Sequence, residues 1–327
     1  MRALVLALCS GLIVAGLTVA LPVNAQSIDN YPTKPIRIVL PFGAPGGASD
    51  IVARLISTRL AEVYGQQVLF DPRNGAGGIL GTEIVARAAP DGYTFLITGP
   101  AHAINLALHN KLPYDTLADF TPVSLVYEVA NILVVHPSVP ARTVKELIAH
   151  ARANPGALTY GSAGNGTSQH LGGELFSKMV NVKMIHVPYK SGAASATDLL
   201  GGRIHLTFGS NTSLPHVRSG KLFALGVTSS RRLAALPDLP TIAESGVADY
   251  ESTAWYAMLA PARTPRPMID KMQTEFGRAL TTADVREKLA AQMIEPIGSR
   301  PAELDAFIKR EIAKWSVIVK ESGAKAE

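Results

Sequence analysis

The chain has little cysteine, few aromatic residues and little charge. Its 327 residues include one cysteine, Cys9, while aromatic residues make up 6% and charged residues 17%. Because Cys9 lies in an N-terminal apolar run, thiol catalysis, thiolate metal sites and a disulfide framework are excluded for the remaining chain. Hydrophobic residues make up 47%, so the chain can bury a large core and is not expected to be disordered.

The sequence also lacks a strong excess of either charge. The formal net charge is +5, and the basic residues are scattered, with Arg231 and Arg232 as the densest pair in the central region. Nucleic-acid binding requires a basic stripe, so we expect no nucleic-acid partner. The eight histidines show no HxxxH or HExxH spacing, which excludes the common zinc motifs. We expect neither a metal nor a cofactor.

Only one hydrophobic run approaches the length of a membrane span. Arg2 precedes an apolar run from Ala3 to Leu21, which is followed by the small-residue pattern Val23-Asn24-Ala25. This order is typical of a secretory signal peptide cleaved after Ala25. We therefore predict that residues 1–25 are a signal and that the mature protein is exported and soluble. An uncleaved anchor is the alternative, since the run is nearly long enough to cross a bilayer.

Short runs rich in β-branched residues alternate with helical patterns over most of the chain. This alternation predicts an α/β fold in which mainly parallel sheets are flanked by helices. The predicted strands are Ile36 to Leu40, Val68 to Phe70, Tyr93 to Thr98, Leu158 to Tyr160, Lys183 to His186, His205 to Phe208 and Phe223 to Val227. The predicted helices are Ser49 to Val63, Leu80 to Ala88, Val144 to Ala153, Ser168 to Met179, Ala193 to Leu200 and a C-terminal helix from near Pro301.

Two apolar stretches, Val123 to His136 and Glu251 to Pro261, do not fit a single βα unit. We interpret them as paired segments that cross between two lobes. Lobe 1 would then comprise residues 26–128 plus 256–327, and lobe 2 residues 129–255. A chain of this length has room for two domains, and the lack of a Gly/Ser linker suits a chain that passes between lobes more than once.

The stretch PFGAPGGASDIVAR, Pro41 to Arg54, joins the first predicted strand to the first predicted helix. In open α/β sheets, ligands bind at this carboxyl edge of the strands. Glycines let a ligand approach the backbone, and Ser49 is a good N-cap. Free amides and the dipole at a helix start favour a carboxylate or a phosphate. The alternative is a tight turn that only joins the strand to the helix.

Four further strand ends carry small polar groups. The stretch LTYGSAGNGTSQHLGGEL, Leu158 to Leu175, repeats the order of strand, glycine-rich turn and hydroxyl residues that open a helix. Similar groups follow three other predicted strands, at Thr98 to His102, Pro188 to Gly192 and Phe208 to Thr212. Five such ends divided between two lobes indicate two half-sites that face one cleft.

Six segments, in order along the chain, carry a resemblance to a known family. They are YPTKPIRIVLPFGAPGGASDIVARL, RNGAGGILGTEIVARAAPDGYTFL, YGSAGNGTSQHLGGELF, HVPYKSGAASATDLLGGRI, LPDLPTIAESG and AWYAMLAPARTP. Together they resemble the tripartite tricarboxylate transporter receptor family, the Bug-type periplasmic solute-binding proteins. The resemblance implies a monomeric, non-enzymatic, two-lobed periplasmic binding protein of type II, the Venus flytrap kind. Such a protein closes on a small carboxylate compound and presents it to inner-membrane transporter subunits or to a sensor.

The resemblance also implies which residues bind the ligand. Amides and hydroxyls of the first and middle glycine-rich loops would hold its carboxylate. In this sequence these residues are Phe42, Gly46, Gly47, Ala48, Ser49 and Asp50, with Gly164, Gly166, Thr167, Ser168 and His170. Candidates for contacts with the rest of the ligand are His102, Tyr189 and Asn211, together with Asn105, Lys190 and Trp255.

A secreted hydrolase acting on a small ester or amide is the alternative function. Ser168 and His170 could suggest a nucleophile and its base, but the segment GTSQH around them lacks the GxSxG order. The loop PGGASD lacks the GxGxxG order of nucleotide-binding loops. The sequence does not name the carboxylate, and it leaves transport and sensing as open alternatives.

Overall fold

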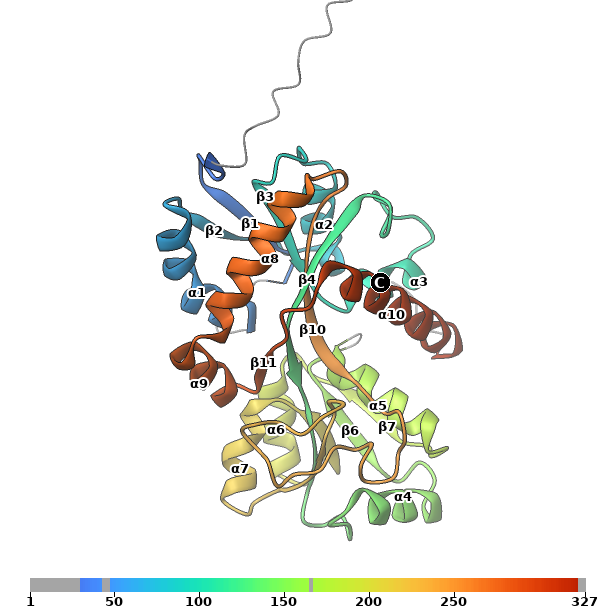
Figure 1. Ribbon diagram of the computed structural model, residues 1–327. Coiled ribbons are helices and arrows are strands. Elements are labelled where there is room, and N and C mark those ends of the chain that lie inside the picture. Colours follow the sequence, from blue (N-terminus) through green and yellow to red (C-terminus); the bar gives the residue numbers. More distant parts are fainter. Residues whose placement is uncertain (1–29, 43–47, 165–166, 323–327) are drawn as a thin grey trace, which may run out of the picture.

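The computed structural model describes residues 30–42, 48–164 and 167–322. Two sheets with helices packed on their faces form two lobes, and long strands run from one lobe towards the other (Figure 1). The predicted signal peptide and the predicted site residues Gly46, Gly47 and Gly166 lie outside the described residues. Within the described ranges, no helix is long and apolar enough to cross a membrane.

In lobe 1 the described strands form one sheet with the order β11-β4-β10-β3-β1-β2. β1 (Ile36–Leu40) pairs in parallel with β2 (Val68–Pro72) and β3 (Thr94–Thr98). The remaining pairs are antiparallel and involve β4 (Phe120–Ala130), β10 (Thr253–Pro261) and β11 (Ile294–Pro296).

In lobe 2 the order is β7-β6-β8-β5-β9. β6 (Thr159–Ser162) pairs in parallel with β7 (Ile185–Pro188) and β8 (Leu206–Gly209), whereas β5 (Ile132–Val135) is antiparallel to β8 and to β9 (Phe223–Val227). Both sheets are therefore mixed, and the prediction of mainly parallel sheets is wrong. The reason is that β10 in lobe 1 and β5 in lobe 2 each enter their sheet antiparallel to their neighbours.

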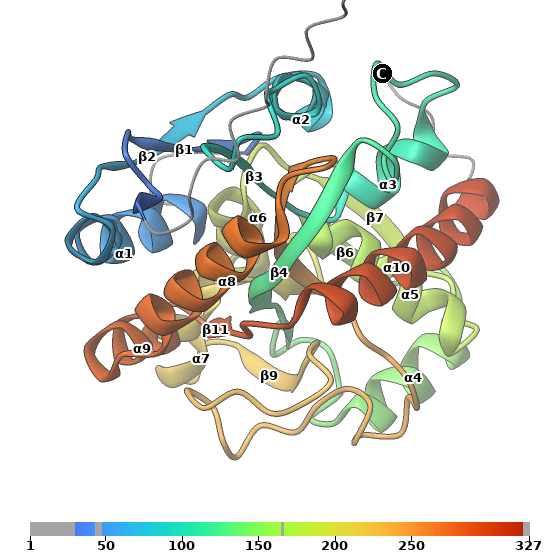
Figure 2. The ribbon, with the colours of Figure 1, turned by 45° about the horizontal axis from the view of Figure 1, so that its top comes forward.

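Helices cover both faces of the sheets, as the tilted view in Figure 2 shows. Lobe 1 carries α1 (Ala48–Tyr64), α2 (Ile79–Ala86), α3 (Ala101–Leu108), α8 (Arg266–Thr281), α9 (Ala283–Ala291), α10 (Pro301–Ser322) and the 3-10 turn η2 (Ala76–Gly78). Lobe 2 carries α4 (Val144–Ala153), α5 (Ser168–Met179), α6 (Gly192–Leu200), α7 (Leu214–Arg218) and the 3-10 turn η3 (Asn211–Ser213). Thr143, Thr167 and Ser191 begin α4, α5 and α6 because each side chain accepts a first-turn amide.

The alternation of side chains along β1 divides the core of lobe 1 in two. Ile36, Ile38 and Leu40 point to one face, where they pack with apolar residues of α1, α8 and α9. Val39 points to the other face and belongs to a cluster that includes residues of α2, α3 and α10. The second cluster continues into lobe 2, where it includes Phe208 of β8. The two lobes therefore share apolar packing and are not independent bodies.

The two predicted crossing segments pair with each other. β10 is antiparallel to β4 from the Thr253–Ala130 pair to the Pro261–Phe120 pair. Only Asn131 separates the end of β4 from the start of β5, so one continuous stretch of chain belongs to both sheets. The predicted pairing of these stretches is confirmed, while the lobe boundaries at residues 128/129 and 255/256 stay predictions.

Candidate functional site

The strand that connects the lobes holds the starts of two helices, one from each lobe. Tyr127, near the end of β4, donates its hydroxyl hydrogen to Ser49 Oγ at 3.1 Å. Asn131, directly after β4, donates from Nδ2 to Ser168 Oγ, also at 3.1 Å. Ser49 is the second residue of α1, and Ser168 is the first residue of α5. Four residues of extended chain span only about 13 Å, so both predicted half-sites flank the same short segment.

In lobe 1, the contact between Tyr127 and Ser49 is buried. Ser49 is 6% exposed, and the Tyr127 ring stacks on Tyr256 with the ring centroids 4.5 Å apart. Burial raises the pKa of Tyr127 well above its ordinary value. The phenol therefore keeps its proton at physiological pH and acts as the donor to Ser49.

Other residues of the first loop surround the start of α1. Phe42 is 42% exposed, and its ring lies so close to Gly78 that a Cβ there would be 2.4 Å from the ring. Ala48, the first residue of α1, is partly exposed. Both carboxylate oxygens of Asp50 accept from Arg54 Nε at 3.0 Å, one helical turn away. Asp50 is therefore paired within α1, which offsets part of the repulsion that its carboxylate would exert on an anionic ligand.

In lobe 2, the start of α5 presents amides of the same kind. Thr167 is the N-cap, and its Oγ1 accepts from the amide of His170 at 3.4 Å. The amides of Ser168 and Gln169 precede that position in the first turn, where no carbonyl of the helix can reach them. These amides and the helix dipole together favour an anion.

Gly164 and His170 have protein partners of their own. Gly164 has a φ of 121°, and its amide donates to Ser162 Oγ at 3.1 Å. The Gly164 amide therefore has a protein partner that shapes the turn, and the predicted ligand contact of Gly164 stays a prediction. The His170 ring stacks on His186 with centroids 4.0 Å apart, and burial lowers the pKa of His170 although Glu174 opposes this. His170 thus supports the loop as a packed, neutral ring.

His102 is buried in lobe 1. Its side chain is 2% exposed and packs between Tyr114 and Phe120, with its Nε2 3.1 Å from the carbonyl oxygen of Thr116. Burial lowers the pKa of His102 to about 4. The strand end at Thr98 leads into helix α3, which carries this side chain into the core, and the predicted ligand contact of His102 stays a prediction.

Tyr189 and Asn211 are also engaged by other side chains. The Tyr189 hydroxyl donates to Asp198 Oδ2 at 2.9 Å. Asn211 Nδ2 donates to Gln292 Oε1 at 2.5 Å, which joins η3 of lobe 2 to the end of α9 in lobe 1. Asn211 therefore takes part in the contact between the lobes. The predicted ligand contacts of Asn211 and Tyr189 stay predictions.

Sequence reasoning missed Tyr127 and Asn131, which connect the half-sites. Both lie in the apolar stretch from Val123 to His136, and their polarity within that stretch was the available signal. Gln169, between two predicted site residues, was also missed.

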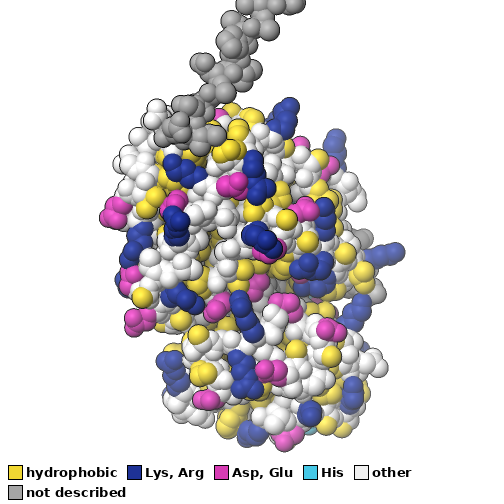
Figure 3. All heavy atoms as spheres, in the orientation of Figure 1, with side chains coloured by type: hydrophobic (Ala, Val, Ile, Leu, Met, Phe, Trp, Pro, Cys, Tyr) yellow, Lys and Arg dark blue, Asp and Glu magenta, His cyan; other side chains and the backbone are white. Residues whose placement is uncertain are grey.

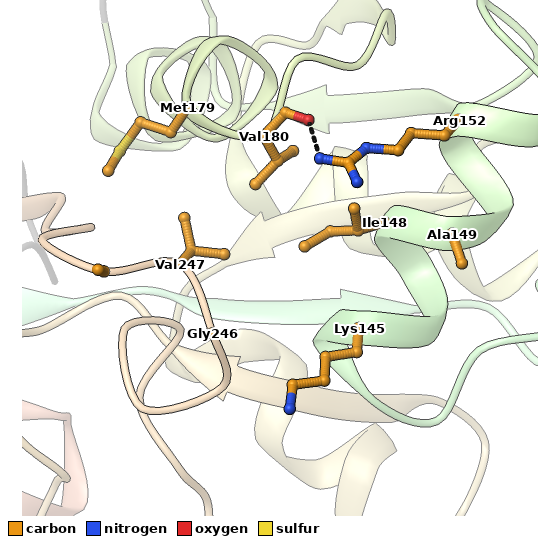
Figure 4. A pocket seen from close by; sticks show the side chains of 9 residues that line it. Lys145, Ile148, Ala149, Arg152, Met179, Val180, Gly246 and Val247 are labelled. Carbon is orange, nitrogen blue, oxygen red and sulfur yellow. Dashed lines mark hydrogen bonds between the residues drawn. The ribbon is translucent and has the colours of Figure 1, made fainter.

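A groove on the outside of lobe 2 lies away from the helix starts. It has a volume of about 550 Å³ and lies on the outside of lobe 2 between α4, the end of α5 and residues 246–248 (Figure 4). Apolar side chains such as Ile148 and Val247 line it, and Arg152 at its edge donates to the carbonyl oxygen of Val180 at 2.9 Å. None of the predicted site residues lines this groove, so it is separate from the helix starts.

The described residues offer no group of histidine, aspartate, glutamate or cysteine side chains that could hold a metal ion. On the face shown in Figure 3, basic and acidic side chains are interspersed over both lobes. This face carries no large basic patch.

Comparison with known proteins identifies the family. Residues 52–324 match the model of the tripartite tricarboxylate transporter family receptor. The chain belongs to this family. It is 36% identical to Protein BugT of Bordetella pertussis over 318 residues, which cover 96% of each chain. It is 37% identical to a UPF0065 protein of Pseudomonas sp. strain P51 over 314 residues, or 94% of this chain and 93% of that one.

Solved structures of this receptor family share the two-lobed α/β fold. A protein of R. palustris, solved with adipate, is 38% identical with a TM-score of 0.74 over 90% of this chain and 98% of that one. MatC from Rhodopseudomonas palustris, solved with bound malate, is 30% identical with a TM-score of 0.69 over 88% of this chain and 100% of that one. The periplasmic binding protein BugD is 32% identical with a TM-score of 0.71, covering 91% and 100%. The predicted family and two-lobed fold are confirmed.

Proposed function

We propose that this receptor is a periplasmic, non-enzymatic binding protein that holds the carboxylate of a small compound between the starts of α1 and α5. The observation that carries the proposal is the pair of hydrogen bonds from Tyr127 and Asn131, which hold Ser49 and Ser168 against one connecting strand. The proposed ligand contacts are the amides and hydroxyls of Ala48, Ser49, Thr167, Ser168 and Gln169 and of the adjoining Gly46, Gly47 and Gly166.

Amides and hydroxyls suffice for useful affinity. A hydrogen bond to a charged group contributes about 1.5 to 3 kcal/mol, so four such bonds contribute roughly 6 to 12 kcal/mol. Micromolar affinity requires about 8 kcal/mol, after the cost of closing and ordering the site. Because helix amides carry partial positive charge, an arginine in the site is not required.

The relatives support the ligand class and the compartment. Two similar structures were solved with the carboxylates adipate and malate, and a third similar protein is named a periplasmic binding protein. By the same reasoning we propose that residues 1–25 direct export, and that the ligand-bound monomer acts on transporter subunits or on a sensor in the inner membrane.

The geometry disfavours the hydrolase alternative. Ser168 Oγ accepts from Asn131 Nδ2, whereas the His170 ring stacks on His186. The Ser168 hydroxyl is therefore held by an amide of the connecting strand and the His170 ring by a second histidine, an arrangement that favours binding over nucleophilic catalysis.

Titration calorimetry with mono-, di- and tricarboxylates tests the proposal. We expect micromolar binding of at least one carboxylate, and we expect Ser168→Ala to weaken it about tenfold with an unchanged circular dichroism spectrum. Ser219→Ala is the matched control, since its exposed hydroxyl donates only to the carbonyl oxygen of His216. Equal affinity in Ser168→Ala and Ser219→Ala would remove the assigned site. Turnover of small esters that is lost in Ser168→Ala would favour the hydrolase instead.

A further inference from the structure

Gln169 presents a buried acceptor at the start of α5. Its side chain is 6% exposed, and its Oε1 has no hydrogen-bond partner among the described residues. A buried amide oxygen without a partner costs about 1 to 3 kcal/mol. Such an atom calls for a partner beyond the described protein contacts, such as a water molecule or a ligand group.

Three loops of lobe 2 converge at this amide. A Cβ built on Gly192, which follows β7, would lie 3.2 Å from Gln169 Nε2 and 3.7 Å from Ser210 Oγ. Gln169 follows β6 and Ser210 follows β8, so the amide lies where the carboxyl ends of three neighbouring strands meet. Ser168, the adjacent residue, is the one that Asn131 holds at the proposed carboxylate site.

Gln169 differs from the other buried polar groups of this region. The Ser195 and Ser213 hydroxyls also lack partners among the described residues, but each packs against a strand glycine, at Gly161 and Gly209. These hydroxyls lie beneath the sheet end, whereas Gln169 lies in the first turn of α5, beside the amides proposed to bind the ligand.

We propose that Gln169 Oε1 accepts a hydrogen bond from a hydroxyl or amino group next to the ligand carboxylate. This inference rests on the proposed function and narrows its ligand class to hydroxy- or amino-substituted acids over unsubstituted ones. Gly192 contributes because a Cβ there would lie 3.2 Å from Gln169 Nε2 and crowd the amide.

Pairs of acids that differ by one hydroxyl test this inference. Calorimetry would compare succinate with malate, glutarate with 2-hydroxyglutarate, and propionate with lactate. One hydrogen bond of ordinary net strength corresponds to roughly fivefold to tenfold in affinity. We expect the hydroxy acid of the best-binding pair to bind more tightly by that factor. In Gln169→Met, which keeps the side-chain length, the two acids of the pair should bind equally.

Gln169→Glu tests the direction of the hydrogen bond. A carboxylate only accepts, whereas an amide can also donate after a half-turn. We expect Gln169→Glu to keep the preference for the hydroxy acid, although charge repulsion weakens the binding of both acids. Gln67→Met and Gln67→Glu, at an exposed position, control for hydrophobicity and charge and should leave both affinities unchanged.

The outcomes separate this inference from the proposed function. If the two acids of the best-binding pair bind the wild-type protein equally, or if Gln169→Met keeps the preference, Gln169 does not recognise the substituent, although the protein is still a carboxylate receptor. If Gln169→Glu loses the preference, the amide acts as a donor and the inference is wrong. If no carboxylate in any pair binds, the proposed function fails and this inference fails with it.

Discussion

At the scale of single residues, buried histidines make the stability of this protein dependent on pH. His102 is enclosed by Tyr114 and Phe120, and burial lowers its pKa to about 4. The same desolvation, with a smaller contribution from His170, lowers the pKa of His186 to about 4. Both rings are therefore neutral in the folded protein at pH 7.

We expect the free energy of unfolding to decrease as the pH falls from about 6.5 to about 4. An unfolded histidine has a pKa of about 6.5, so in this window the unfolded chain binds more protons than the folded chain, which favours unfolding. Because His102 is fully buried, it accounts for up to about 3 kcal/mol of this decrease in the free energy of unfolding. The side-chain amide in His102→Gln can still donate a hydrogen bond to the carbonyl oxygen of Thr116. Urea denaturation should therefore show a smaller decrease in the free energy of unfolding from pH 7 to pH 4.5 in this variant than in the wild-type protein.

The control for this experiment is His109→Gln, at the partly exposed end of the same helix. It should leave the pH dependence as in the wild-type protein. An equally steep loss of stability in His102→Gln would show that other groups cause it.

At the scale of elements, one buried carboxylate attaches α10 to the sheet of lobe 1. Glu311 is 7% exposed, and its Oε2 accepts from the indole nitrogens of Trp255 in β10, at 2.7 Å, and Trp315 in α10, at 2.8 Å. Lys314 Nζ lies 2.6 Å from the other oxygen. Trp255, considered above as a ligand contact, is therefore part of the core.

We expect Glu311→Ala to lower the free energy of unfolding by about 3 to 5 kcal/mol, because it leaves two buried indole N–H groups unpaired and the charge of Lys314 uncompensated. Chemical denaturation would measure this. Asp305→Ala removes an exposed ion pair with Lys309 on the same helix and should cost less than about 1 kcal/mol. Similar losses in the two variants would contradict the anchoring role of Glu311.

Most elements could be predicted because their signals are local. The alternation at Ile36 to Leu40 and the cap at Thr167 depend only on neighbouring residues, and the observed β1 and α5 have the predicted bounds. Helix α3 was not predicted, since the glycine and proline at positions 99 and 100 indicated a loop end. Its apolar residue Ile104 packs in the same cluster as Ile308 of α10, a contact with a segment about 200 residues later.

At the scale of the whole molecule, the lobes touch at the end of α9 as well as through the crossing strands. Met293, between α9 and β11, is 2% exposed and belongs to an apolar cluster of lobe 2 that includes Leu214 and Val227. The neighbouring Gln292 accepts from Asn211. The relative position of the lobes is therefore held at this point, and a receptor that closes on its ligand must accommodate this contact.

We expect Asn211→Ala to lengthen and broaden the distribution of distances between the lobes in the absence of ligand. The hydrogen bond to Gln292 is lost, while the Met293 contact keeps the variant folded. Single-molecule fluorescence transfer would measure this between cysteines introduced at Glu62 in lobe 1 and Lys221 in lobe 2, both exposed. Asn154→Ala, which removes a hydrogen bond within α4, is the control. Identical distributions in the two variants would show that the Asn211 contact does not hold the lobes.

The sequence by itself indicated the family, the alternation of strands and helices over most of the chain, and the two glycine-rich helix starts, because motifs, periodicity, caps and loop composition are local properties. Only the tertiary structure decided which polar side chains remain for a ligand. Tyr127 contacts Ser49 from 78 positions away and Asn211 contacts Gln292 from 81 positions away. Whether a polar group is paired or available depends on such distant neighbours, which pack together only when the two sheets are formed.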